Sequence, residues 1–212
     1  MKKRHLVYAI ALIVGMGACA ASAKKQAEAK PDVWKSYNVG TVLFEDKASE
    51  TKGSDIYHRI IPDAESYIKE QARTVLATLY NSPEDSITPV NKIHYTLEDI
   101  EGISAKGGGN GDVTIFYSTR HIEKSFAEND TAKLFFETRG VLLHELTHAY
   151  QLEPQGIGSY GTNRVFWAFI EGMADAVLVD FHRLRTECPS ERRKLHGRLS
   201  DSRLFLRLVA RQ

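Results

Sequence analysis

The chain has 212 residues, of which 42% are hydrophobic, 26% charged and 9% aromatic, and its formal net charge is +1. This is the composition of an ordinary globular protein, and it excludes a wholly disordered or collagen-like chain. The length allows one domain with a proper core and is short for two. Both ends of the chain are basic and residues 24–182 are acidic, which argues against a nucleic-acid-binding domain.

The first 23 residues have the pattern of a secretory signal peptide. A basic start precedes an apolar run over residues 6–16, which is too short to cross a bilayer of about 30 Å as a helix. Two cleavage sites compete. Cleavage after Ala21-Ser22-Ala23 would release a soluble protein, whereas Gly17-Ala18-Cys19 resembles a bacterial lipobox that would place a lipid on Cys19. We therefore expect an exported protein, either secreted or in the cell envelope, with contact to a membrane only through that lipid anchor.

The remaining chain predicts one domain of the α+β class, preceded by a tether over residues 24–36. In chain order, the pattern predicts a strand at 39–45, a polar loop at 47–55, an amphipathic helix at 62–80 and a strand at 91–97. A flexible glycine-rich turn at 107–111 and a strand at 112–118 follow. Two helices complete the domain, at 131–151 with Asp130 as its N-cap, and at 163–180.

The central motif is His144-Glu145-Leu146-Thr147-His148, which has the H-E-x-x-H spacing. Positions i and i+4 lie on one face of a helix, so both imidazoles can bind a single ion. Glu145 lies about 100° around the helix, where it can reach a water on that ion without being a ligand. Zinc prefers imidazole nitrogen and carboxylate oxygen and keeps one position open for water in catalytic sites. We therefore predict a Zn²⁺ site in which Glu145 accepts a proton from water.

A third ligand must come from another element. Glu171, on the following predicted helix, is the best candidate because it lies among apolar residues unsuited to a free carboxylate, although an exposed helical position is the alternative. Asp175, one turn later, is placed to accept the second N–H of a ligating histidine; otherwise it is a simple surface residue. Tyr160 and Tyr150 are candidate donors to a developing oxyanion, with packing an equal alternative. His58, His94 and His121 are scattered in the sequence without partners at ligand spacing, and we expect them to have structural or surface roles.

Two segments resemble the basic secretory protein family of plants and bacteria, which is grouped with zinc peptidases of the gluzincin type. These segments are residues 140–151, which contain the H-E-x-x-H motif, and residues 166–175, which contain Glu171-Gly172-Met173-Ala174-Asp175. Weaker similarity extends over residues 37–180, and we place the domain at 37–182.

The resemblance implies a zincin-like single domain, with a small mixed sheet over an active-site helix and a second ligand-bearing helix. It also implies His144, His148 and Glu171 as zinc ligands, Glu145 as general base, and Asp175 behind a ligating histidine. In zincins an edge strand lines the cleft and pairs with an extended peptide substrate, and residues 112–118 would be that strand.

The last thirty residues depart from the family pattern, because residues 183–212 contain eight arginines and one lysine. A truncated or frameshifted reading frame, a true Arg-rich tail for an acidic partner and a divergent closing helix all explain this composition.

The sequence thus predicts an exported zinc metallopeptidase acting on peptides or proteins. The alternatives are a non-catalytic zinc-containing binding or defence protein of the same fold, and a metal hydrolase of other carbonyl compounds.

Overall fold

The computed structural model describes residues 32–186. The predicted signal peptide with Cys19, most of the tether, and the Arg-rich tail beyond residue 186 lie outside the described residues. The elements in chain order are β1 (Thr41–Asp46), α1 (Lys52–Ile60), α2 (Ala64–Leu79), β2 (Lys92–Glu98), β3 (Ser104–Gly109), β4 (Asp112–Ser118), α3 (Thr119–Ser125), α4 (Thr131–Tyr150) and α5 (Arg164–Thr186). The class is α+β, as predicted.

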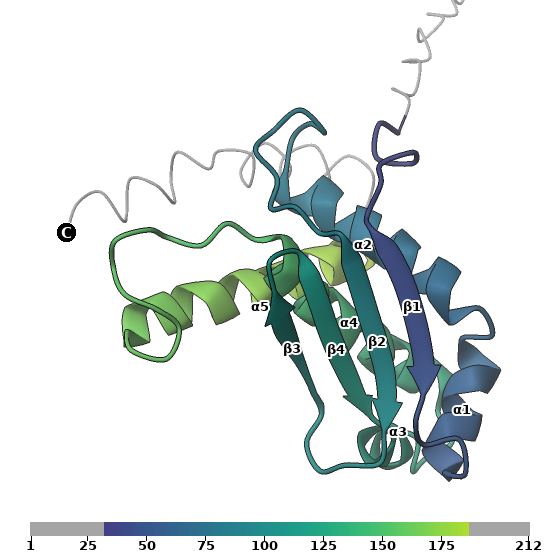
Figure 1. Ribbon diagram of the computed structural model, residues 1–212. Coiled ribbons are helices and arrows are strands. Elements are labelled where there is room, and N and C mark those ends of the chain that lie inside the picture. The colour runs from purple at the N-terminus through teal and green to yellow at the C-terminus, as the bar shows by residue number, and fades with distance from the viewer. Residues whose placement is uncertain (1–31, 187–212) are drawn as a thin grey trace, which may run out of the picture. The chain divides into compact units, whose positions relative to one another are not determined.

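The four strands form one mixed sheet in the order β1-β2-β4-β3 (Figure 1). Strands β1, β2 and β4 are parallel, and β3 runs antiparallel to β4. The helices α2 and α4 lie behind the sheet in Figure 1, where α2 packs against β1 and α4 packs against β3. The sheet therefore has one face covered by helices, the arrangement predicted from the resemblance to zincins.

The prediction that residues 112–118 form the edge strand is wrong. These residues form β4, which lies between β2 and β3, and the edge is β3 instead. The reason is the two-residue turn at Asn110 and Gly111, whose φ angles are 53° and 83°. Positive φ at both positions matches the right-handed twist of a hairpin, so this turn pairs β3 with β4. The glycine run that we expected to be a flexible turn is therefore largely strand.

The predicted polar loop at 47–55 is also partly wrong, because α1 begins at Lys52. Thr51 caps this helix by accepting a hydrogen bond from the Ser54 N–H at 3.2 Å. Ile56 and Tyr57 are buried against the sheet side of the domain. With only nine residues and few large apolar side chains, α1 did not stand out from a loop in the sequence.

The core lies between the covered face of the sheet and the helices. Alternate strand residues point into it, among them Ile93, Tyr95, Val113 and Ile115, and they meet Leu146 and other apolar residues of the helices. This packing fixes the rotation of α4, whose apolar side chains face the sheet. No helix of the described residues has the length and apolar character needed to cross a bilayer.

Candidate metal centre

The histidine pair lies on the second half of α4, as the i, i+4 spacing requires. Asp130 begins the helix by accepting a hydrogen bond from the Lys133 N–H at 2.9 Å. His144 and His148 are half-buried, and their Nε2 atoms are 3.1 Å apart. The two imidazole planes meet at 87°, so both Nε2 atoms face a common point from different directions.

Glu171 reaches the same point from α5, which packs across α4. Its Oε2 is 3.3 Å from His144 Nε2, and its Oε1 is 3.6 Å from His148 Nε2. The Glu171 side chain is 24% exposed, so it is not a free surface carboxylate. The three side chains that we grouped from the sequence are therefore brought together. They form a group that could hold a metal ion, and we call these three residues the metal group.

The outer nitrogen of each imidazole also has a neighbour. His144 Nδ1 is 3.2 Å from Asp175 Oδ1, and His148 Nδ1 is 2.9 Å from the Gln151 Nε2 atom. The Gln151 Oε1 atom is buried without a hydrogen-bond partner. A half-turn of this amide would let that oxygen accept an N–H from His148 Nδ1. Both rings would then carry their proton on Nδ1 and direct a lone pair from Nε2 toward Glu171, as ligating histidines do.

The donor separations fit an ion of the size of zinc. Nitrogen and oxygen donors about 2.0–2.1 Å from a tetrahedral ion lie roughly 3.3–3.4 Å from one another. The measured separations of 3.1, 3.3 and 3.6 Å bracket this value. Two lone pairs and a carboxylate this close together repel one another unless a cation lies between them. The arrangement can therefore hold a metal ion.

The pKa of His148 is also suited to ligation. Burial and the neighbouring His144 lower this pKa to about 4, although the charge of Glu171 opposes the shift. The imidazole is therefore neutral at physiological pH, which is the form that binds a metal.

Glu145 is 7% exposed and lies against the edge strand β3. Burial raises the pKa of its carboxyl group, and the charge of Glu171 adds to this, while His144 and hydrogen bonds from Ser104 and the Lys106 backbone oppose it. The Ser104 hydroxyl also lies 2.5 Å from the Phe116 carbonyl, so its one proton has two competing acceptors. A carboxyl group with a raised pKa beside a metal group is poised to take up a proton.

Tyr160 extends the site toward the loop before α5. Its hydroxyl donates to Glu171 Oε1 at 2.8 Å and accepts a hydrogen bond from Trp167 Nε1 at 3.0 Å. The hydrogen bond to Glu171 raises the pKa of the Tyr160 hydroxyl, and burial adds to the shift. The hydroxyl keeps its proton at neutral pH and is held at the rim of the metal group.

Comparison with known proteins identifies the family. The family model of peptidases of plants and bacteria, the basic secretory proteins, matches residues 39–197. The chain belongs to this family. A search of curated proteins finds no match. The basic secretory protein match includes every residue of the group just described and extends into the Arg-rich segment that begins at residue 183.

The other candidate residues of this basic secretory protein lie away from the metal group. His58 Nε2 is 2.9 Å from Asp46, and His94 Nε2 is 2.9 Å from Glu45 on β1. His121 lies on α3, where its ring contacts Ser125. The Tyr150 hydroxyl donates to the Val39 carbonyl at 2.9 Å and is fully buried, so Tyr150 packs in the core rather than facing a substrate.

Sequence reasoning missed three neighbours of the site: Gln151, Ser104 and Lys106. Gln151 follows the H-E-x-x-H motif by three residues, one helical turn beyond His148, and this spacing was a readable signal. Ser104 and Lys106 had no comparable signal, because they belong to a strand whose last three residues, 107–109, were read as part of a turn.

Proposed function

We propose that this protein is an exported, zinc-dependent peptidase that hydrolyses peptide bonds with Glu145 as the general base. The observation that carries the proposal is the convergence of two imidazole Nε2 atoms and the Glu171 carboxylate beside a buried Glu145. Membership of a peptidase family supports peptides or proteins as the substrates. Two imidazole nitrogens and one carboxylate, with their Nδ1 neighbours in place, are the ligand set that zinc takes in hydrolases.

In this proposal His144, His148 and Glu171 would hold the zinc. Bound zinc supplies Lewis acidity, which makes water easier to deprotonate and a peptide carbonyl easier to attack. Glu145 accepts the proton of the attacking water at its carboxylate and then delivers it to the amine nitrogen of the leaving peptide. The Tyr160 hydroxyl, whose oxygen accepts a hydrogen bond from Trp167, would turn its proton from Glu171 Oε1 to the carbonyl oxygen as negative charge develops on it.

The substrate would bind along β3. This strand pairs with β4 on one side, and on its other side no strand of the described residues covers it. The strand touches Glu145 through Ser104 and Lys106, so a peptide paired with β3 passes the general base. Three successive glycines, 107–109, leave no side chains to obstruct that edge. Main-chain hydrogen bonds to β3 would supply affinity for many sequences.

Export is proposed from the signal-peptide pattern of residues 1–23. Two mature forms follow from the two cleavage sites, a soluble chain that begins at Lys24 and a lipid-modified chain that begins at Cys19. Intact mass of the protein purified from its host distinguishes them, because only the second carries added acyl chains. A mass that retains all of residues 1–23 would contradict export by cleavage.

The decisive experiment is Glu145→Gln, with Glu137→Gln on the same helix as the matched control. We expect zinc analysis to find one equivalent in wild type and in both variants, because neither glutamate belongs to the His144, His148 and Glu171 group. Cleavage of a peptide library should fall about 10²–10⁴-fold in Glu145→Gln and remain unchanged in Glu137→Gln. Unchanged turnover in Glu145→Gln would remove this residue from the mechanism. Stoichiometric zinc with no cleavage by wild type would instead favour the non-catalytic zinc-containing protein.

A further inference from the structure

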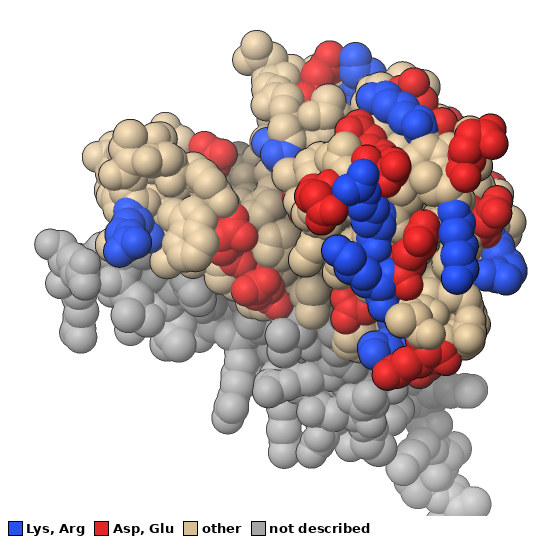
Figure 2. Space-filling view, turned by 90° about the horizontal axis from the view of Figure 1, so that it is seen from below, with Lys and Arg blue, Asp and Glu red and all other residues tan. Residues whose placement is uncertain are grey.

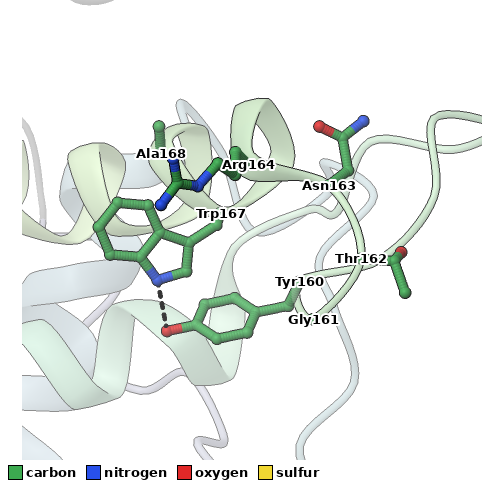
Figure 3. Close-up of a pocket in the computed structure, with 7 residues that line it drawn as sticks. All are labelled: Tyr160, Gly161, Thr162, Asn163, Arg164, Trp167 and Ala168. Atoms are coloured by element: carbon green, nitrogen blue, oxygen red, sulfur yellow. Dashed lines mark hydrogen bonds between the residues drawn. The ribbon is translucent and has the colours of Figure 1, made fainter.

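A cavity of about 500 Å³ opens at the start of α5, next to the metal group. It is lined by residues of the loop before α5 and of the first helical turn: Tyr160, Gly161, Thr162, Asn163, Arg164, Trp167 and Ala168 (Figure 3). The proposed mechanism uses Tyr160, with Trp167 holding its hydroxyl, and no other residue of this set. The cavity therefore needs its own explanation.

Helical spacing and hydrogen bonds give the cavity one aromatic wall and one cationic group. Arg164 and Trp167 are three residues apart on α5 and lie on the same side of the helix, with Tyr160 below them (Figure 3). The hydrogen bond from Trp167 Nε1 to the Tyr160 hydroxyl fixes the two rings relative to each other. Both rings remain about half exposed, at 48% for Trp167 and 49% for Tyr160, so they present open apolar surface to a ligand.

The loop that closes the cavity is held by its own polar contacts. The Thr162 hydroxyl lies 3.0 Å from the Ser159 hydroxyl, and the Asn163 side chain donates to the Ile157 carbonyl at 2.5 Å. Asn163 also caps α5 by accepting a hydrogen bond from the Val165 N–H at 2.8 Å. These contacts engage the polar side chains of Thr162 and Asn163, and Arg164 is the charged residue among those that line the cavity.

The charge of the cavity points to an anionic ligand. Arg164 is exposed, and no carboxylate of the described residues forms an ion pair with it. The positive end of the α5 dipole lies at the same place, because Arg164 is the first residue of the helix. In Figure 2 the part of the molecule at the left, which contains the start of α5 and the loop before it, is mostly uncharged, and a hollow with acidic side chains separates it from the sheet. The acidic side chains of that hollow oppose an anion, so selection of a carboxylate depends on the guanidinium, which can bind a carboxylate through two parallel N–H groups.

Tyr160 connects this cavity directly to the proposed reaction centre. Its hydroxyl is 2.8 Å from Glu171 Oε1, and its ring forms the cavity wall. A peptide whose scissile bond lies at the metal group would therefore place a neighbouring side chain, or its own chain end, in the cavity.

We propose that this cavity is a specificity pocket that binds a carboxylate of the peptide substrate, with Arg164 as the charged partner and Trp167 and Tyr160 as the aromatic wall. The proposal rests on the peptidase function proposed above. The carboxylate belongs either to an acidic side chain next to the scissile bond or to the C-terminus of a short peptide, and both place the same group against the guanidinium. The aromatic rings pack against the methylene groups that precede it.

The test uses matched peptides on the zinc-loaded full chain. One pair carries Glu or Gln beside the scissile bond with both ends blocked, and a second pair has no acidic residue and ends in a free carboxylate or an amide. The variants are Arg164→Gln, Arg164→Lys and, as the matched control outside the cavity, Arg120→Gln, whose guanidinium pairs with Asp99 and Glu101. Binding of the same peptides without cleavage is measured by calorimetry on Glu145→Gln protein.

We expect wild type to prefer the carboxylate member of one pair by about tenfold in kcat/KM and in Kd. The pair that shows the preference identifies the source of the carboxylate. Arg164→Gln should abolish the preference, Arg164→Lys should keep part of it, and Arg120→Gln should keep all of it. A carboxylate that binds the zinc itself would keep its advantage in Arg164→Gln.

Three results would overturn the pocket: no preference in wild type, a preference that survives Arg164→Gln, or equal losses for both members of a pair. Carboxylate-dependent binding that needs Arg164, with no cleavage of any peptide by wild type, would leave the pocket standing and refute the peptidase function.

Discussion

Asp175→Asn tests whether the carboxylate behind His144 supports metal binding. Asp175 Oδ1 lies 3.2 Å from His144 Nδ1, at a distance where it can accept the N–H and hold the ring so that Nε2 faces the ligand group. Removing such a partner costs about 10–100-fold in metal affinity. Because the Asp175 side chain is 70% exposed, solvent screens the interaction, and we expect the lower end of that range, about tenfold.

A tenfold loss of zinc affinity corresponds to about 1.4 kcal/mol. The stabilisation that excess zinc gives the folded protein should fall by the same amount, because a ligand that binds only the folded state stabilises it in proportion to the logarithm of its affinity. For a domain of this size, the zinc-induced rise in Tm should therefore be about 3–6 °C smaller in Asp175→Asn than in wild type.

Zinc affinity is measured by competition with a chromophoric chelator, and Tm by thermal unfolding with and without zinc. The metal-free variant should match metal-free wild type within about 0.5 kcal/mol, because the substitution is at an exposed position. Asp99→Asn, which removes an exposed carboxylate paired with Arg120, is the control and should leave zinc affinity unchanged. An unchanged zinc Kd in Asp175→Asn would refute the role of this carboxylate.

Two further predictions concern the end of β1 and the helix after it. Burial alone would raise the pKa of Asp46, but hydrogen bonds, led by the one from Ser54, lower it below its ordinary value. At a pH above the ordinary pKa of aspartate, Asp46→Asn should therefore cost about 1–3 kcal/mol of stability. The stability that comes with a lowered pKa is lost as the pH falls through that pKa. The free energies of unfolding of wild type and Asp46→Asn, measured in urea, should therefore converge in acid. A difference in stability that does not change with pH would contradict this. Gly53→Ala should destabilise by at least about 1–3 kcal/mol, because a Cβ there would lie 2.2 Å from the Thr119 carbonyl oxygen. Gly172→Ala is the control: a Cβ there meets nothing within 4 Å, and the substitution should stabilise the protein by about 0.5–1 kcal/mol. Equal unfolding midpoints for the two alanine variants would disprove the close packing of α1 on α3.

The cavity at α5 also changes how the family motif is interpreted. The stretch from Phe166 to Asp175 contains the third predicted ligand and its neighbour, and the same helix supplies Arg164 and Trp167 to the cavity wall. One helix thus carries a residue that could hold a metal ion and residues proposed for substrate selection. Because the hydrogen bonds of Tyr160 join the two sets, a change at Trp167 is expected to affect both cleavage and selectivity.

The local sequence pattern was sufficient to predict several elements of this protein and part of its site. The i, i+4 spacing of His144 and His148 predicts a shared site on any helix, and Asp130 predicts where that helix begins. The long helices and the strands at β1, β2 and β4 were also predicted, because their apolar residues repeat with helical or alternating spacing. These features depend on residues close in sequence, so a single sequence contains the information.

Features that depend on distant contacts were decided only by the tertiary structure. The order of the strands follows from how the Asn110-Gly111 hairpin and the crossovers pack together, and this makes β3, not β4, the edge strand. Three glycines supply no side-chain pattern, so β3 could not be recognised by alternation even though it reaches Glu145. The meeting of Arg164 with an aromatic wall beside the metal group depends on a loop whose path is set by its own hydrogen bonds. Sequence periodicity records which face of an element is buried, whereas strand order and loop path depend on packing between elements that are far apart in the chain.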